Sequence, residues 1–399
     1  MPQDPIGVWL IGAHGGVGTT SVVGLAALQR GLVDSTALVS ALPQFSRLAL
    51  PNWQQFVVGG HDIRATSFAE SAENLLQVSH VLDAGHLQKC SRELAKWDKN
   101  IQRGTLQNVG KTIESLADPA LLETRESPRD TITRIQSDLQ SFVSLHRLRQ
   151  LVVINVASTE PPFDVATLPT SWSELNKQLG QPRKCKLPAS SLYAIAALEL
   201  GFPYINFTPS LGSAPAAICE LARQRGTCHM GHDGKTGETL LKSVLAPMFA
   251  ARHLEVMSWV GHNIFGNLDG KVLDDPLNKK TKVTSKDSLL GQILGYHPQT
   301  LVSIEYIQSL GDWKTAWDHI HFRGFLGTPM TMQFTWQGCD SLLAAPLVLD
   351  LLRFTCLAQQ QGEQGLLTFL ASFFKSPLGV KENNFAKQFA MLEAWAEKT

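Results

Sequence analysis

The chain has 399 residues, of which 35 are basic and 35 acidic, so its formal net charge is zero. A hydrophobic fraction of 44% with 18% charged residues is typical of an ordinary globular protein, and the length suits two domains or one large α/β body with an insertion. The balanced charge argues against nucleic acid or an anionic membrane as the main partner, which leaves small molecules.

The N-terminal segment and the cysteines indicate where the protein works. The segment MPQDPIGVWLIGAHGG lacks a basic region, and glycine interrupts its apolar run too early for a signal peptide or a membrane span. The six cysteines include no CxxC pair, and the histidines are scattered, so neither a disulfide framework nor a metal site is indicated. We therefore expect a cytoplasmic protein without a metal.

The first predicted unit is a strand, a glycine-rich turn and a helix. Residues 6–11 form a short apolar run, residues 12–18 the turn, and residues 19–30 a helix closed by Gly31. Glycines permit close approach of a ligand, and the free N–H groups at a helix start attract a phosphate. We expect a dinucleotide to bind here, and the candidate contacts are Gly12, His14, Gly15, Gly16, Val17 and Gly18.

Two other interpretations of this turn remain. The run GGVGTT resembles a nucleotide-triphosphatase loop, although Thr19 stands where that loop needs lysine. A glycine turn can also simply pack a helix on a sheet. The spacing departs from G-x-G-x-x-G, and no acid ends the next predicted strand, residues 36–42, where an acid commonly binds the ribose.

Polar residues end two further predicted strands of this half. Residues 56–63 run into Gly-Gly-His-Asp, and residues 151–156 are followed by Ala-Ser-Thr-Glu. Ligands bind at the carboxyl ends of strands in open α/β sheets, so Asp62, Ser158 and Thr159 are candidate cofactor contacts. The alternative is that Asp62 and Ser158 cap the helices that follow. Residues 65–150 between them are predicted to be helical and polar.

Lysines recur beside Gly, Asp, Ser or Pro at four places in the second half of the chain. These are GHDGKTGET, NKKTKVTSKDS, GDWK and FFKSPLG. In a chain of balanced charge, the recurrence predicts a converging site that holds a phosphate and polarises an oxygen. Lys282 and Lys286 would share one face of a helix, and the alternative for this pair is a solvated basic surface. Asp312 and Lys314 are two apart, so an extended segment points both to the same side.

Several motifs resemble, in the same order, those of the myo-inositol-1-phosphate synthase family. They are the segment 201–249, HNIFGNLDG, TKVTSKDS, GDWK, CDSLLAAPLVLDLL and FFKSPL. The resemblance implies an NAD-dependent, redox-neutral isomerase that acts on the sugar phosphate D-glucose 6-phosphate. In that family NAD⁺ oxidises C5, C6 loses a proton, the enolate attacks the C1 aldehyde, and reduction gives 1D-myo-inositol 3-phosphate, which feeds inositol and phospholipid biosynthesis.

The resemblance also implies roles for individual residues. Its catalytic positions fall on Lys282, Lys286, Lys314, Lys375, Asp233, Asn267 and Asp269. Polar positions that would contact the cofactor fall on Asn206, Thr208, Asp312 and Asp340. Lys242 also matches a lysine of the family, and we interpret it as structural.

The implied fold class is α/β, with a Rossmann-like, doubly wound NAD domain and an inserted α+β domain for catalysis and oligomerisation. We expect residues 1–245 and 345–399 in the first and residues 246–344 in the second, whose sheet joins subunits into homotetramers in that family. Strands are predicted at residues 301–307 and 330–336, and a long buried helix is predicted from CDSLLAAPLVLDLLRFTCLA.

Five positions depart from the family pattern. The family's Asn-Gly-Ser-Pro has Phe207 in place of glycine, a bulky ring beside the expected nicotinamide, and His232, Ile264, Leu268 and Glu305 replace other usual residues. Loss of polar side chains at a sugar site costs hydrogen bonds. The pattern fits a divergent synthase, a net oxidoreductase acting on another sugar phosphate, or a non-catalytic NAD-binding subunit.

Overall fold

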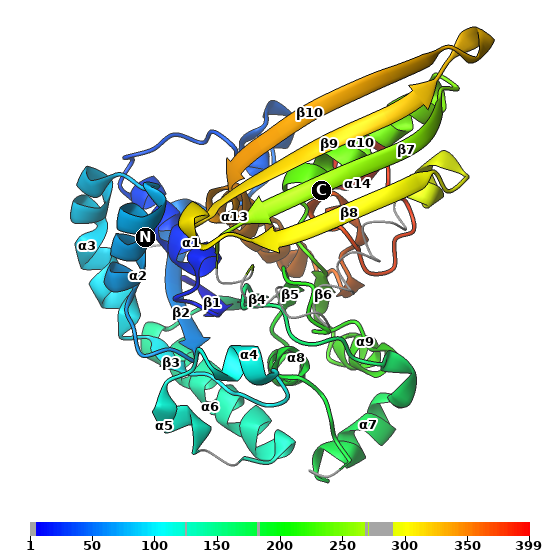
Figure 1. Ribbon diagram of the computed structural model, residues 1–399. Coiled ribbons are helices and arrows are strands. Elements are labelled where there is room, and N and C mark those ends of the chain that lie inside the picture. Colours follow the sequence, from blue (N-terminus) through cyan, green and yellow to red (C-terminus); the bar gives the residue numbers. More distant parts are fainter. Residues whose placement is uncertain (1–4, 124–125, 182–183, 268–269, 271–289) are drawn as a thin grey trace.

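The computed structural model describes residues 5–123, 126–181, 184–267, 270 and 290–399, and they form two sheets with their covering helices (Figure 1). The larger sheet has seven strands in the order β11-β6-β5-β4-β1-β2-β3, and every neighbouring pair is parallel. Its strands are β1 Ile6–Ile11, β2 Phe56–Asp62, β3 Ile101–Arg103, β4 Gln150–Asn155, β5 Tyr204–Asn206, β6 Cys228–Gly231 and β11 Gly365–Leu366. This parallel sheet confirms the predicted α/β class.

Both faces of the seven-stranded sheet are buried, as the continuous apolar run of its central strand β1 requires. Ile6, Val8 and Leu10 point into one hydrophobic core, and Trp9 and Ile11 point into the other, because successive side chains of a strand alternate between faces. The first core contains residues of α1 Gly16–Gln29, α2 Phe68–Ser79, α3 Ala84–Asp98, α13 Asp340–Gln360, η7 Thr368–Phe373 and α14 Phe385–Lys398. The second contains residues of α4 Lys111–Glu114, α6 Pro128–His146, α7 Trp172–Leu179, α8 Ala189–Glu199 and α9 Ala216–Gln224, and α5 Pro119–Leu122 precedes α6.

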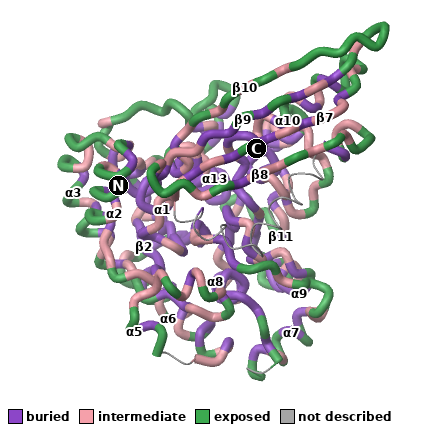
Figure 2. Tube along the Cα trace, in the orientation of Figure 1, coloured by how far each residue is buried: buried purple, intermediate pink, exposed green. Residues whose placement is uncertain are grey.

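The second sheet has four strands in the order β10-β9-β7-β8. Its strands are β7 Glu255–Phe265, β8 Gln299–Tyr306, β9 Trp313–Arg323 and β10 Pro329–Cys339, with β7 parallel to β8 and the other pairs antiparallel. Phe249 of α10 Gly237–Ala251 packs on its inner face with Trp259 and Ile320. Figure 2 shows mostly exposed and half-buried residues on β8 and β10, in contrast to the buried strands of the larger sheet.

Helix α13 returns the chain from the second sheet to the first, as predicted. It packs along α1, where Thr20 Oγ1 donates a hydrogen bond to Ser341 Oγ at 3.1 Å. The helix is long and apolar enough to cross a membrane, but 72% of its most apolar stretch is buried against other parts of this chain. Its hydrophobicity is therefore explained by its place in the core.

The predicted strand at residues 36–42 is wrong. The segment contains the 3₁₀ turn η1 Val39–Ala41, and a second turn, η2 Pro43–Phe45, follows it. Further 3₁₀ turns connect other elements: η3 Trp53–Gln55, η4 Val165–Thr167, η5 Gln308–Leu310 and η6 Phe325–Gly327, which joins β9 to β10. The buried carboxylate of Asp350 on α13 accepts the backbone N–H groups of Val39 at 2.6 Å and Ser40 at 2.9 Å. These donors are therefore not available to a sheet.

The predicted domain boundaries stay a prediction.

Candidate active site

A single cleft of about 880 Å³ gathers most of the predicted site residues. It lies at the carboxyl ends of β1, β2, β4 and β5 and reaches the start of β9, which is where open α/β sheets bind ligands. The predicted residues that line it are Gly12, His14, Gly15, Gly16, Val17, Asp62, Ser158, Thr159, Thr208, Asp233, Asn267, Asp312, Lys314, Asp340 and Lys375.

The glycine turn at the start of α1 leaves room for a ligand at one position and none at another. Gly12 has φ +80°, and its N–H donates to His61 O at 2.9 Å, which fixes the turn against β2. A Cβ on Gly18 would lie 2.3 Å from Ala13 O, so Gly18 serves the packing of helix on strand and does not line the cleft. A Cβ on Gly16 would have no neighbour closer than 3.6 Å. The N–H groups in the first turn of α1 have no acceptors within the helix, and they lie on the open side of the glycine turn. This side therefore fits a phosphate.

Asp62 ends β2, the strand next to β1, which is the place of the ribose-binding acid in dinucleotide folds. The sequence predicts residues 36–42 as the second strand, which has no acid at its end, and names Asp62 as a cofactor contact at the end of the strand after it. The carboxylate accepts His14 N at 2.8 Å and Arg64 N at 2.9 Å, so it orders the loops around the turn and does not cap a helix. His14 Nε2 lies 3.0 Å from Asp98 Oδ1. This acid and the glycine turn together fit the ribose and diphosphate of NAD.

A buried hydrogen-bond network underlies the cleft at the ends of β4 and β5. Asn155 Nδ2 donates to Asn206 Oδ1 at 3.1 Å, and Asn206 Nδ2 donates to Ser210 O at 2.6 Å. Thr208 Oγ1, which lines the cleft, donates to Asn206 Oδ1 at 2.9 Å. Asn206 itself is buried and does not line the cleft, so the structure places it as a support for the loop that carries Thr208.

The second sheet brings two acids and a lysine to the same cleft. Asp312 Oδ2 accepts Ser341 N at 2.9 Å, and a Cβ on Gly16 would lie 3.7 Å from Asp312 Oδ1, so the carboxylate faces the glycine turn. Burial raises the pKa of Asp312 above its ordinary value, while its hydrogen bonds to Cys339 and Ser341 oppose the rise. Lys314 Nζ lies over the Phe265 ring at 5.3 Å.

Asp340 and Asn267 lie at the same end of the cleft. Asp340 N donates to Asp312 O at 3.0 Å, at the start of α13. Asn267 Nδ2 donates to Asp340 Oδ2 at 3.3 Å. The two sheets therefore share this end of the cleft, and residues from both can contact one ligand.

The last pair comes from two chain segments that run side by side. Lys375 Nζ forms an ion pair with Asp233 Oδ1 at 2.9 Å, and both side chains are largely buried. Lys375 N also donates to Asp233 O at 2.6 Å, and an isolated β-bridge joins Gly234 to Phe374. Backbone and side-chain contacts together fix one ammonium group in the cleft, with an acid beside it.

A sequence model of a family of NAD-binding proteins, myo-inositol-1-phosphate synthase, matches residues 6–397. The chain belongs to the myo-inositol-1-phosphate synthase family. It is 31% identical over 395 residues to inositol-3-phosphate synthase 1 of Bacteroides thetaiotaomicron, covering 94% of this chain and 89% of that protein. The rice inositol-3-phosphate synthase 1 is 27% identical, covering 97% of this chain and 84% of the rice protein.

Solved structures show the same fold. The inositol-3-phosphate synthase of Caenorhabditis elegans superposes with a TM-score of 0.86 at 22% identity, covering 98% of this chain and 85% of that one. A myo-inositol-1-phosphate synthase-related protein of Thermotoga maritima superposes with a TM-score of 0.81 at 22% identity, covering 98% of both chains. The Rossmann-like sheet and the separate mixed sheet are thus those of a myo-inositol-1-phosphate synthase.

Three of the catalytic residues expected for a myo-inositol-1-phosphate synthase, Lys282, Lys286 and Asp269, lie outside the described residues. The predicted convergence of all four lysine motifs needs a correction at Lys235, because this side chain is buried away from the cleft. Its ammonium group donates a hydrogen bond to Gln388 of α14, and burial lowers its pKa to about 8. Lys235 thus ties α14 to the segment that carries Asp233.

Two of the departures from the synthase pattern also lie away from the cleft. Ile264 and Glu305 are register partners on neighbouring strands β7 and β8, and neither lines the cleft. They therefore remove no polar contacts from the cleft as the described residues line it. Lys242, expected to be structural, is buried and pairs with Glu238 at 2.6 Å behind the second sheet.

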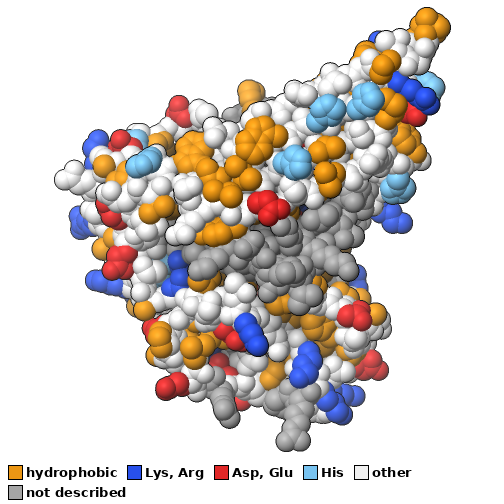
Figure 3. Space-filling model, in the orientation of Figure 1, with side chains coloured by type: hydrophobic (Ala, Val, Ile, Leu, Met, Phe, Trp, Pro, Cys, Tyr) orange, Lys and Arg blue, Asp and Glu red, His pale blue; other side chains and the backbone are white. Residues whose placement is uncertain are grey.

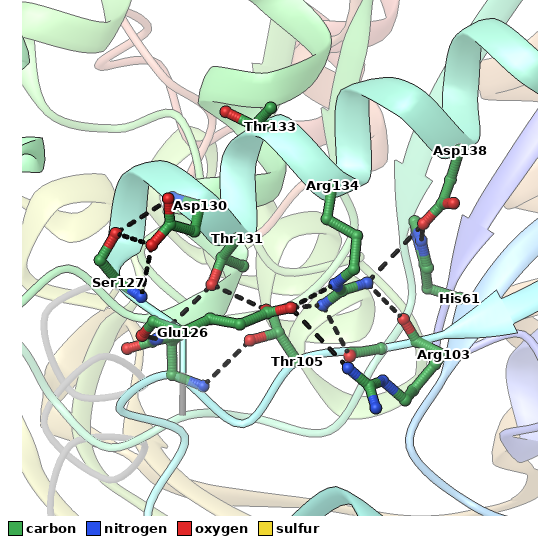
Figure 4. A network of polar contacts seen from close by, with 12 residues as sticks. His61, Arg103, Thr105, Glu126, Ser127, Asp130, Thr131, Thr133, Arg134 and Asp138 are labelled. Carbon is green, nitrogen blue, oxygen red and sulfur yellow. Dashed lines mark hydrogen bonds and ion pairs between the residues drawn. The ribbon is translucent and has the colours of Figure 1, made fainter. Parts of the chain in front are cut away.

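His61 at the floor of the cleft belongs to a polar network that reaches α6 (Figure 4). Trp9 Nε1 donates to His61 Nδ1 at 2.8 Å, and His61 Nε2 lies 3.1 Å from Asp138 Oδ2. Arg134 lies 3.7 Å from Asp138 and 2.8 Å from Glu126. Burial lowers the pKa of His61, which favours the neutral ring. Both nitrogens of that ring have partners, so the residue supports the end of β2.

Sequence reasoning missed Glu160, which also lines the cleft. Its carboxylate accepts Ser190 N at 2.8 Å at the start of α8, and it accepts the Ser190 hydroxyl as well. Burial raises its pKa to about 7, and the hydrogen bonds from Ser190 oppose this. The signal was present, because Glu160 directly follows the predicted Ser158-Thr159 pair. Among the described residues, no group of three or more His, Cys, Asp or Glu side chains is arranged to hold a metal ion.

Proposed function

We propose that this chain is an NAD-dependent inositol-3-phosphate synthase that converts D-glucose 6-phosphate into 1D-myo-inositol 3-phosphate, for inositol and phospholipid biosynthesis. The observation that carries the proposal is the meeting of the glycine turn, Lys314 and the Asp233–Lys375 pair in one cleft. These residues meet in a chain that is 31% identical to a protein named inositol-3-phosphate synthase 1.

The chemistry asks for a hydride carrier and for fixed positive charge. Bound NAD⁺ would take a hydride from C5 and return it after ring closure. The turn at Gly15 and Gly16 would hold its diphosphate, and Asp62 its adenosine ribose. The ammonium groups of Lys314 and Lys375 would face sugar oxygens, where they stabilise alkoxide, enolate and aldehyde oxygens as negative charge develops.

Asp233 has a separate task beside Lys375. Its carboxylate lies 2.9 Å from the ammonium group and fixes the direction of that group. Lysine side chains lose much rotamer freedom when ordered, so an anchored lysine is better prepared for a transition state than a free one. Asp312, Asp340 and Asn267 would contact nicotinamide and sugar from the second sheet, and Lys282, Lys286 and Asp269 are proposed to complete the site.

We further propose a cytoplasmic homotetramer that assembles through the four-stranded sheet. The outward face of that sheet carries exposed apolar side chains such as Leu301 and Trp317. Figure 3 shows hydrophobic and histidine side chains gathered over this sheet. A large exposed apolar face supports a contact between proteins. The proposed division is a cofactor domain of residues 1–245 and 345–399 and an inserted domain of residues 246–344.

One assay separates the proposal from its alternatives. The purified protein is incubated with NAD⁺ and glucose 6-phosphate, while NADH absorbance and inositol phosphate are both followed. A synthase forms inositol phosphate without net NADH. Accumulating NADH without inositol phosphate would indicate a net oxidoreductase, and bound NAD without either product a non-catalytic subunit.

A further inference from the structure

The ring of Phe207 occupies the space that a side chain at position 234 would need. A Cβ on Gly234 would lie 2.1 Å from Phe207 Cζ and 2.4 Å from Phe207 Cε1, closer than any real contact. The backbone of Gly234 does not have the positive φ that would by itself exclude a side chain. Phe207, which replaces the glycine usual in the family's Asn-Gly-Ser-Pro, therefore forces glycine at position 234.

Backbone hydrogen bonds tie this ring to the ion pair of the cleft. Gly234 N donates to Phe207 O at 2.8 Å, and Asp233 N donates to Thr208 O at 2.9 Å. The segment of Asp233 in turn pairs with the segment of Lys375. Phe207 is only 8% exposed and belongs to the first core, yet it lines the cleft. Its packed position makes it a rigid wall.

We propose that Phe207 is a specificity-determining residue that forms an apolar wall against the carbon skeleton of the sugar phosphate. This role rests on the proposed function, and it concerns which sugar phosphates the cleft can bind. The resemblance placed this residue beside the nicotinamide. The structure puts its ring against Gly234, next to the Asp233–Lys375 pair that we assign to the sugar, while the glycine turn follows β1, two strands away in the sheet.

A wall of this kind acts in two ways. It covers the carbon-bound hydrogens of a hexose without offering a hydrogen bond, so an apolar face of the sugar must lie there. It also leaves no room for a bulky substituent, because the ring is held from behind by the first core. We therefore expect the protein to reject 2-acetamido-2-deoxyglucose 6-phosphate in favour of glucose 6-phosphate.

The packing part is tested by exchanging volume between the two positions. Gly234→Ala should lower the melting temperature of the wild-type chain, because the new Cβ overlaps the ring. The same change should be tolerated in a Phe207→Gly background, where the ring is gone. The exchange Phe207→Gly with Gly234→Phe restores the aromatic volume from the other side, and Phe207→Leu is a milder variant that keeps the core filled.

The specificity part is tested by calorimetry on NAD-saturated protein, with the two hexose 6-phosphates as probes. Phe207→Gly and Phe207→Leu should each reduce the preference for glucose 6-phosphate by about tenfold, the size typical of opening a small apolar pocket. The double exchange should recover most of it. NAD⁺ affinity without sugar should stay within about twofold of wild type, because we place the ring outside the cofactor site.

Two results would overturn the inference. One is an unchanged preference in variants whose melting temperatures shift as the packing predicts, since Phe207 would then be a core residue only. The other is a matching loss of NAD⁺ affinity, which would assign the ring to the cofactor. No sugar binding by the wild-type holoenzyme would instead contradict the proposed function, and this inference with it.

Discussion

Replacing Lys375 by methionine separates the catalytic role of this residue from its contribution to stability. The change keeps the apolar stem but removes an ammonium group 2.9 Å from Asp233 Oδ1, where the two side chains are 15% and 13% exposed. A charge-assisted hydrogen bond contributes about 1.5–3 kcal/mol, and the carboxylate left behind is poorly solvated, so we expect a stability loss of about 2–3 kcal/mol. Loss of one group that stabilises an oxyanion lowers turnover roughly 10²–10³-fold.

Turnover at saturating substrate and the free energy of unfolding in urea are measured together. Lys387→Met is the matched control, because its pair with Glu382 at 3.3 Å has side chains that are 69% and 35% exposed. Such a pair contributes under about 1 kcal/mol, and its loss should leave turnover unchanged. Adding Asp233→Asn to Lys375→Met should recover stability but not turnover. Turnover of Lys375→Met within tenfold of wild type, or an equal loss in the control, would show that Lys375 does not stabilise a reacting oxygen.

Three further predictions concern the rest of the cleft. Gly16→Val should abolish NAD⁺ binding in calorimetry while the melting temperature changes little, because a Cβ at this position meets nothing closer than 3.6 Å; Gly24→Ala on the same helix is the control. Asp62→Ala should weaken NAD⁺ binding by about 1–2 kcal/mol, and unchanged affinity would reduce Asp62 to a support of the turn. Glu160→Gln should raise the melting temperature at pH 8 but not at pH 5. Its pKa of about 7 in the fold exceeds the ordinary 4.5, so protonation stabilises the fold at low pH and this stabilisation, at most about 3 kcal/mol, is lost as pH rises through 7.

The sequence predicted those helices and strands that are specified by residues close together in the chain. The apolar run at residues 6–11, the glycines after it and the apolar spacing of residues 339–358 each specify one element, and the structure has β1, α1 and α13 there. Polar residues after strands predicted Asp62, Ser158 and Thr159, which line the cleft, because the carboxyl ends of parallel strands share one edge. These predictions needed no knowledge of distant contacts.

The errors came from contacts between distant segments. Residues 36–42 look like a strand, but Asp350, more than 300 positions away, takes their N–H groups. Lys235 looks like its neighbours in the lysine motifs, but Gln388 of α14 draws it into the interior. The Phe207 ring has room only because residue 234, to which Phe207 is hydrogen-bonded through its backbone, is a glycine. Side-chain direction at such places is set by tertiary packing, which one sequence does not display.

The most direct test of the proposed function follows one hydrogen atom. Glucose 6-phosphate that carries deuterium at C5 is converted with unlabelled NAD⁺, and the inositol phosphate and the recovered cofactor are analysed by mass spectrometry. A redox-neutral synthase removes and returns the same hydride, so we expect inositol phosphate that retains the deuterium and a cofactor recovered as unlabelled NAD⁺. Deuterium accumulating in reduced cofactor, or absent from the inositol phosphate, would contradict it.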